Sequence, residues 1–381
     1  MRGYRFLSAV ALAVLALPLL LPAGARAEGR AVDIAVSAGA SRPCLVIAHR
    51  GASAYLPEHT LEAYALAVRL GADYIEPDLV MTRDGVLIAR HDNVLNLTTD
   101  IGSRPEFAGR RTKKPVDGEE VEGWFSEDFT LSELKTLRAA ERIADVRPRN
   151  AMFDGRFAIP TFDEILALRA ELERETGRRI GVYPETKHPT HFQAAGLAME
   201  HPLVETLKSH GLAEADAPVF IQSFETANLR ALDDMIEVPL IQLLWKEGQP
   251  FDVRAAGGTT TYDEMATAKG LQAIAAYADG VGPEKNHFVI PFAADGRLDV
   301  ARATPFVADA HAAGLVVHPY TFRAENHFLP AEYRGEGPAT AGGDGKGEIE
   351  AFLATGIDGF FTDNPDVGAS ACRAFAQRRR G

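Results

Sequence analysis

The chain has 381 residues, of which 24% are charged, and a formal net charge of −13 at pH 7. So acidic a chain is a poor match for nucleic acid or for an anionic membrane surface, because both carry negative charge. Its length suits one large α/β domain carrying an insertion, or two domains.

Residues 1–27 have the pattern of an export signal peptide. A cationic start precedes an almost wholly apolar stretch over residues 6–21, and Ala25-Arg26-Ala27 fits a cleavage site. Cleavage after Ala27 would remove three arginines and no acidic residue, so the net charge would become −16. We therefore expect a periplasmic or secreted protein of residues 28–381, forming a single domain without stable membrane insertion.

The two cysteines, Cys44 and Cys372, flank nearly all of residues 28–381. In an oxidising compartment they can pair, and a closed barrel would bring the first strand beside the last helix. Two buried free thiols explain the sequence equally well, so both states stay open.

Strand-like and helical stretches alternate along the chain. Strands are expected at residues 45–48, 74–79, 181–185, 219–222, 240–244, 280–282, 315–320 and 359–362. Helices are expected at residues 61–69, 162–175, 195–209, 226–235, 262–277, 304–313 and 348–354. This alternation predicts a parallel TIM (β/α)8 barrel, with a doubly wound open sheet as the alternative. No glycine-rich phosphate-binding motif follows the first strand, so nothing favours a dinucleotide-binding fold.

Residues 97–159 interrupt this alternation with a charged segment that follows the second strand and its hairpin. We expect this insertion to lie over the barrel mouth as a lid. Its basic run at residues 110–115 would either steer an anionic substrate or form an ordinary solvated face, and the second interpretation is favoured.

The most informative stretch covers residues 45–91. His49 and Arg50 end the first expected strand, Glu76 and Asp78 lie near the end of the second, and His91 follows the returning strand of a hairpin. Arginine can hold a phosphate as a planar fork, carboxylates bind hard cations, and histidines transfer protons near neutral pH. Such a set of side chains can cleave a phosphodiester.

The hairpin geometry supports this grouping. Residues 82–85 predict a turn, and if Met81 faces Val86, antiparallel pairing places Glu76 opposite His91. A slip of one residue in this register would undo the inference.

Several short motifs follow one another along the chain: His49-Arg50-Gly51, Pro57-Glu58-His59-Thr60, Glu76-Pro77-Asp78, His91-Asp92, Tyr183-Pro184-Glu185-Thr186-Lys187, Val317-His318-Pro319-Tyr320 and Phe361-Thr362-Asp363. Together they make residues 45–367 strongly resemble the glycerophosphodiester phosphodiesterase family, above all its periplasmic bacterial branch.

The resemblance implies a TIM barrel that hydrolyses glycerophosphodiesters, such as glycerophosphocholine and glycerophosphoethanolamine, to sn-glycerol 3-phosphate and an alcohol. It implies His49 and His91 as the acid/base pair, with Arg50 on the phosphate. It implies a divalent cation, Ca²⁺ with Mg²⁺ as the alternative, on Glu76, Asp78 and Glu185. An all-oxygen ligand set agrees, because it favours these ions over Zn²⁺.

Residues at other strand ends are candidates for substrate binding: Lys187, Gln222, Phe224 and Tyr320. Lys187 is equally well explained by an ion pair with Glu185, and the two aromatic residues by core packing. Gln222, His318 and Asp363 are expected to form hydrogen bonds behind the residues that touch substrate or metal.

Two further expectations concern Glu58 and the positions at which the chain departs from the family pattern. Glu58 is expected to anchor Arg50 or to cap the helix that begins near Thr60. The family usually has Asn in place of His59 and Trp near Tyr320, and we expect both positions at the pocket rim, where they would affect head-group preference.

Two alternative functions remain. A phospholipase C- or D-like enzyme on the same barrel would need an apolar landing surface, and residues 97–159 are too charged to suggest one. A non-enzymatic exported protein that binds glycerophosphodiesters would need no pair of proton-transferring histidines.

Overall fold

The computed structural model describes residues 44–380, so the expected signal peptide lies outside the described residues. The central strands are parallel, and each predicted strand is present, although several are shorter. They are β1 Leu45–His49, β2 Tyr74–Glu76, β3 Asp78–Met81, β7 Gly181–Val182, β8 Glu185–Thr186, β9 Ile221–Ser223, β10 Leu240–Leu244, β11 Gly280–Pro283, β12 Val316–Val317 and β13 Gly359–Thr362.

These strands form two sheets, with strand orders β13-β1-β2-β7 and β12-β11-β10-β9-β8-β3-β4, in which the edge strand β4 (Leu87–Ala89) pairs antiparallel to β3. Strands β2 and β3 are the two halves of one predicted strand, separated at Pro77, and Pro184 likewise precedes β8. Proline has no N–H to donate, so the ladder is interrupted at both places. Beyond β12, the N–H of Phe361 donates to the carbonyl of Pro319 (3.1 Å) and that of Phe322 to Phe361 (2.8 Å). The predicted α/β class is therefore confirmed.

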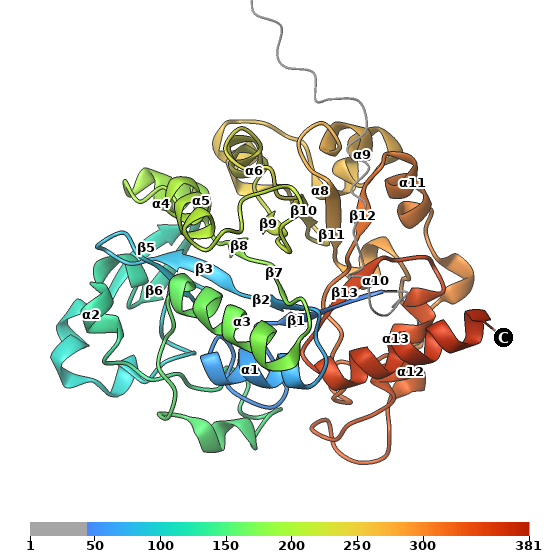
Figure 1. Ribbon diagram of the computed structural model, residues 1–381, viewed down its shortest axis with the longest axis horizontal. Helices are drawn as coiled ribbons and strands as arrows, with labels where there is room; N and C mark the ends of the chain where they lie inside the picture. The colour runs from blue at the N-terminus through green and yellow to red at the C-terminus, as the bar shows by residue number, and fades with distance from the viewer. Residues whose placement is uncertain (1–43, 381) are drawn as a thin grey trace, which may run out of the picture. The chain divides into compact units, whose positions relative to one another are not determined.

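Helices flank these strands (Figure 1). They are α1 Leu61–Arg69, α2 Leu131–Leu134, α3 Phe162–Thr176, α4 Pro189–Ala194, α5 Glu200–Ser209, α6 Thr226–Asp233, α7 Phe251–Ala255, α8 Tyr262–Met265, α9 Ala268–Ile274, α10 Lys285–Phe288, α11 Phe306–Ala312, α12 Gly345–Leu353 and α13 Pro365–Arg380. The single helix predicted at residues 262–277 is two helices, because the Thr267 side chain caps a new one by accepting from Gly270 N. No range was predicted for α2, α4, α7, α10 or α13, although the sequence implied a last helix that carries Cys372. Within residues 44–380, none of the helices combines the length and apolar character needed to cross a bilayer.

Side-chain alternation divides the apolar residues between the two faces of the strands. In β1, Val46 and Ala48 belong to the large hydrophobic cluster, whereas Ile47 belongs to a second, smaller cluster. That smaller cluster, called here the inner cluster, draws one buried residue from each of several neighbouring strand segments: Ile47, Tyr183, Phe220, Ile241 and Phe361.

The register predicted for the hairpin is wrong by one residue. Strand β4 (Leu87–Ala89) pairs with β3 so that Met81 faces Leu87. Thr82 N donates to the carbonyl of Val86 (3.0 Å) and closes a three-residue loop, in which Gly85 has a φ of 79°. His91 still reaches the site, because pairing ends at Ala89 and the chain then leaves the strand.

The insertion at residues 97–159 contains a two-stranded hairpin, β5 (Thr112–Val116) and β6 (Glu119–Gly123). Basic side chains of the hairpin pair with its own acidic residues: Arg111 with Glu122 at 2.8 Å and Lys113 with Glu120 at 3.0 Å. These half-exposed pairs support the interpretation of the basic run as a solvated face.

Cys44 and Cys372 form a disulfide, with their Cα atoms 6.0 Å apart. The bond joins the residue before β1 to helix α13, and both cysteines are buried. Of the two states that the sequence left open, the structure has the disulfide.

Replacing both cysteines (C44A/C372A) should lower the free energy of unfolding by about 2–4 kcal/mol, because the cross-link restricts the unfolded chain. Denaturant unfolding of the oxidised wild type and the double variant checks this. Equal midpoints, with a thiol assay confirming that the wild type is oxidised, would contradict it.

Candidate functional site

One cavity of about 1130 Å³ collects almost all the predicted site residues. It is lined by His49, Arg50, Glu76, His91, Glu185, Lys187, Gln222, Phe224 and Tyr320. Asp78 is buried directly behind them, within ligand distance of Glu76 and Glu185.

The strands explain why these side chains meet. Residues two apart on a strand face the same side, so a residue two positions after a member of the inner cluster lies above that cluster. This spacing relates Ile47 to His49, Tyr183 to Glu185, Phe220 to Gln222, and Phe361 to Asp363. The inner cluster is therefore the apolar floor of a polar site.

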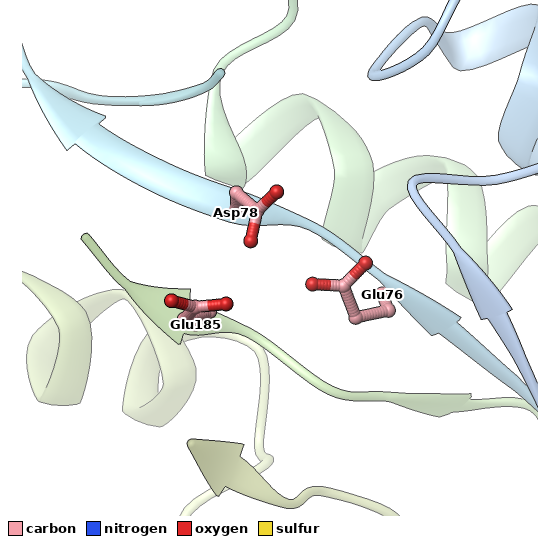
Figure 2. A group of neighbouring side chains, drawn as sticks. All are labelled: Glu76, Asp78 and Glu185. Atoms are coloured by element: carbon pink, nitrogen blue, oxygen red, sulfur yellow. The ribbon is translucent and has the colours of Figure 1, made fainter. Parts of the chain in front are cut away.

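Three carboxylates point toward one another at the strand ends (Figure 2). Glu76, Asp78 and Glu185 each offer an oxygen, and these oxygens lie within 4.8 Å of one another. Burial and the neighbouring Asp78 charge raise the pKa of Glu76 well above its usual value, and burial raises that of Glu185 to about 8. So crowded a set of oxygen ligands fits a hard divalent cation.

Other contacts of the three carboxylates agree with this assignment. Burial alone would raise the pKa of Asp78, but the Arg50 and Lys187 charges hold it well below the usual range. Gln222 Nε2 donates to Glu76 Oε1 (3.2 Å), while Gln222 Oε1 is buried without a hydrogen-bond partner. This amide oxygen is one more oxygen atom of the type that serves as a ligand of a hard divalent cation.

Arg50 is held in an uncommon backbone conformation at the end of β1. Its φ is 59°, and its N–H donates to Glu76 Oε2 at 2.8 Å. Its Nη1 donates to Glu58 at 3.1 Å, and its Nε lies 3.2 Å from Asp78 Oδ2. The next residue must be glycine, because a Cβ on Gly51 would lie 2.8 Å from a backbone carbon of Ala63.

Each of the two predicted histidines is oriented by a carboxylate. His49 Nδ1 lies 2.6 Å from Asp363 Oδ1, and His91 Nδ1 lies 2.8 Å from Asp92 Oδ1. Burial and the Arg50 charge lower the pKa of His49 to about 4 and that of His91 to about 3. Both rings are therefore neutral at pH 7, and with Nδ1–H given to the carboxylate, Nε2 carries the lone pair.

Two arginines of the insertion hold these orienting carboxylates, and sequence reasoning missed both. Arg142 donates to Glu58 Oε1 (2.6 Å) and Asp92 Oδ2 (2.9 Å). Arg147 Nη2 donates to Asp363 Oδ2 at 2.6 Å. They lie in an irregular segment without a recognisable motif, so no local pattern could have found them.

The expectation for Glu58 is confirmed, since it binds Arg50. The expectation for His59 is wrong, because this side chain is fully buried and not at the rim. His59 Nε2 lies 2.9 Å from Asp78 Oδ2, and its Nδ1 lies 2.8 Å from the Tyr64 hydroxyl. Its φ of 55° explains the residue type, because Asn and His tolerate this region better than most side chains.

The remaining predictions have mixed outcomes. Lys187 Nζ forms the ion pair with Glu185 at 2.9 Å and also lies 3.5 Å from His91 Nε2. Asp363 supports His49 as expected. The expectation for His318 is wrong: it is buried against the inner cluster, where its Nδ1 lies 3.0 Å from the Tyr183 hydroxyl. It lies two positions before Tyr320, the residue of this segment that lines the cavity.

Known proteins match this chain over most of its length. Residues 49–367 match the glycerophosphoryl diester phosphodiesterase family. The glycerophosphodiester phosphodiesterase GDPD6 of Arabidopsis thaliana is 37% identical over 83% of this chain and 82% of its own. The glycerophosphodiester phosphodiesterase of Haemophilus influenzae is 32% identical over 85% and 88%.

Solved structures share the fold. A crystal structure from Silicibacter pomeroyi, described as a glycerophosphoryl diester phosphodiesterase, has a TM-score of 0.61 at 22% identity, covering 89% of this chain and 96% of that one. An Oleispira antarctica phosphodiesterase in complex with the product sn-glycerol-3-phosphate has a TM-score of 0.55 at 21% identity, covering 86% and 96%. The chain belongs to the glycerophosphoryl diester phosphodiesterase family.

Proposed function

We infer that the protein hydrolyses glycerophosphodiesters to sn-glycerol 3-phosphate and an alcohol. The observation that carries this conclusion is the single cavity that brings Arg50, two carboxylate-oriented histidines and three clustered carboxylates together. Family membership and the relatives that bear this activity as their name agree with it.

In the proposed mechanism, Arg50 binds the non-bridging oxygens of the phosphodiester, since its guanidinium is a planar fork for phosphate. One imidazole, His49 or His91, takes the proton from the attacking oxygen through Nε2. The other imidazole donates a proton to the departing alkoxide. It is neutral in the free protein, so it must take up that proton when the anionic diester binds, and the proton removed by the first imidazole replaces it after turnover. Lys187, beside His91, adds positive charge where negative charge grows on the phosphate.

The cation that we propose for Glu76, Asp78 and Glu185 is Ca²⁺, with Mg²⁺ as the alternative. When bound, it would act as a Lewis acid toward a phosphoryl oxygen. Phe224 and Tyr320, with ring centroids 6.1 Å apart, wall the cavity beside this centre, and Gln222 holds Glu76. We assign these three residues to substrate binding and to support of the site.

We further propose that the strands close into a (β/α)8 barrel and that residues 97–159 cover its mouth. The hydrogen bonds between the segment after β12 and β13 support closure, and Arg142 and Arg147 support the position of the insertion. We propose export to the periplasm or medium, because the disulfide suits an oxidising compartment and residues 1–27 have the signal-peptide pattern.

Alanine at His49 or at His91 should lower kcat by on the order of 10²–10⁴, because each removes a general acid or base. The assay is release of sn-glycerol 3-phosphate from glycerophosphocholine. The control is His201→Ala, an exposed histidine of α5. Less than tenfold loss in both variants would refute the assignment.

Chelation should abolish hydrolysis, and Ca²⁺ or Mg²⁺ should restore it, because the cation proposed for the three clustered carboxylates would supply the Lewis acid of the reaction. In a titration of the EDTA-treated protein, Glu185→Gln should need at least tenfold more metal ion for half-maximal activity. Activity insensitive to EDTA would exclude a metal-dependent reaction.

Arg142→Ala should lower kcat by about tenfold to a hundredfold with a smaller change in KM, since Asp92 and Glu58 lose the group that holds them. Arg142→Lys should recover only part, because lysine cannot bridge both carboxylates as a fork. The matched control is Arg149→Ala, an exposed arginine of the same segment. Loss of thermal stability with kcat unchanged would mean that Arg142 only stabilises the fold.

A further inference from the structure

The cavity extends from the three carboxylates into a second region, whose acidic residues the mechanism does not use. Its lining includes Asp117, Glu225, Phe224 and Tyr262, and Asp252 lies close enough to influence the charge of Glu225. These residues come from the β5–β6 turn, the loop after β9, and helices α7 and α8. We call these five residues the acidic compartment.

Glu225 is the central residue of the acidic compartment. It is only 3% exposed and lines the cavity. Its Oε2 accepts hydrogen bonds from the N–H (3.1 Å) and the hydroxyl of Thr190, but its Oε1 is buried without a partner. One oxygen each of Asp117 and Asp252 is also buried and unpartnered. Buried polar atoms without partners are uncommon, so three in one place point to a missing ligand.

The compartment brings acidic side chains together without a cation on Glu225. Burial, together with Asp117 and Asp252, raises the pKa of Glu225 to about 8. Among residues 44–380, the basic side chains nearby bind groups other than Glu225: His188 Nδ1 lies 2.5 Å from Asp117 Oδ2, Arg254 donates to the backbone carbonyl of Asp117, and Lys187 pairs with Glu185. A positively charged ligand beside Glu225 would provide such a cation.

The spacing of the acids favours an organic cation over a metal ion. Within the described residues, only Glu76, Asp78 and Glu185 bring three ligand atoms within 4.8 Å of one another. The compartment also presents aromatic rings, since Phe224 and Tyr262 pack edge to face with centroids 6.2 Å apart. In the adjoining part of the cavity, Trp245 stacks on Tyr320. Aromatic faces combined with carboxylates are the chemistry that recognises substituted ammonium groups.

We propose that the acidic compartment binds the ammonium head group of the substrate, of choline or ethanolamine type, and so makes the enzyme selective for cationic glycerophosphodiesters. This inference rests on the proposed function. The compartment adjoins the reacting centre, because the ring of Phe224 lies 5.7 Å from Lys187 Nζ and Glu225 follows Gln222 by three residues.

The test compares kcat/KM for glycerophosphocholine and for glycerophosphoglycerol, whose leaving alcohol is neutral. The wild type should favour glycerophosphocholine by at least about tenfold, and Glu225→Gln should lower this ratio by about tenfold, mainly through KM. Asp117→Asn should act in the same direction and serves if the first variant does not fold. The control is Glu171→Gln, an exposed glutamate of α3, which should keep the wild-type ratio.

A wild-type ratio near one, or a ratio that neither acidic variant changes, would overturn the proposal. Calorimetric binding of glycerophosphocholine to His49→Ala, with and without Glu225→Gln, separates the two inferences because it needs no turnover. If the wild type hydrolyses neither diester, the proposed function is overturned. If Glu225→Gln nevertheless weakens binding of glycerophosphocholine, head-group recognition is still supported. Equal binding by both proteins would overturn head-group recognition even if the wild type is active.

Discussion

Parallel strands present every second side chain to the same face, and the site depends on this constraint. Ile47, Tyr183, Phe220 and Phe361 form a close-packed apolar layer, and the residues two positions later are polar. The layer excludes water from beneath the carboxylates and fixes the strands that carry them. A change of volume in this layer would move several polar side chains at once, because packed interiors transmit displacement.

Ion pairs then fix the positions of the polar side chains above this layer. Several arginines beside the cavity contact more than one carboxylate, as Arg50 does between Glu58 and Asp78. Arg142 spans Glu58 and Asp92, and Arg147 spans Asp363 and Glu325. The insertion therefore supports both imidazoles through their carboxylate partners, although it contributes neither imidazole.

The sequence was sufficient to predict those site residues that lie at strand ends within recognisable motifs. The strands were located correctly because apolar runs bounded by turn residues are local signals. The hairpin register was wrong because the loop closes at Thr82 and Val86, a difference of one residue that no residue type specified. His91 was nevertheless correctly grouped, because it lies beyond the paired region.

The contacts that the sequence did not reveal are those between distant, irregular segments. Arg147 and Asp363 are 216 residues apart, and neither lies in a periodic pattern that would suggest their meeting. His59 was misplaced for a related reason: its backbone conformation, with a φ of 55°, directs the ring toward Asp78, and no residue pattern in the sequence specified that conformation. Long-range polar contacts of this kind follow from the assembled fold.

The disulfide between Cys44 and Cys372 has a consequence for how the protein tolerates damage. Because it links the start of β1 to α13, almost every peptide bond of the folded part lies inside one covalent loop. A protease that cuts one exposed loop would leave two fragments that stay attached and keep a high effective concentration for each other. A single cut in the chain would therefore not separate the strands that carry the two halves of the site.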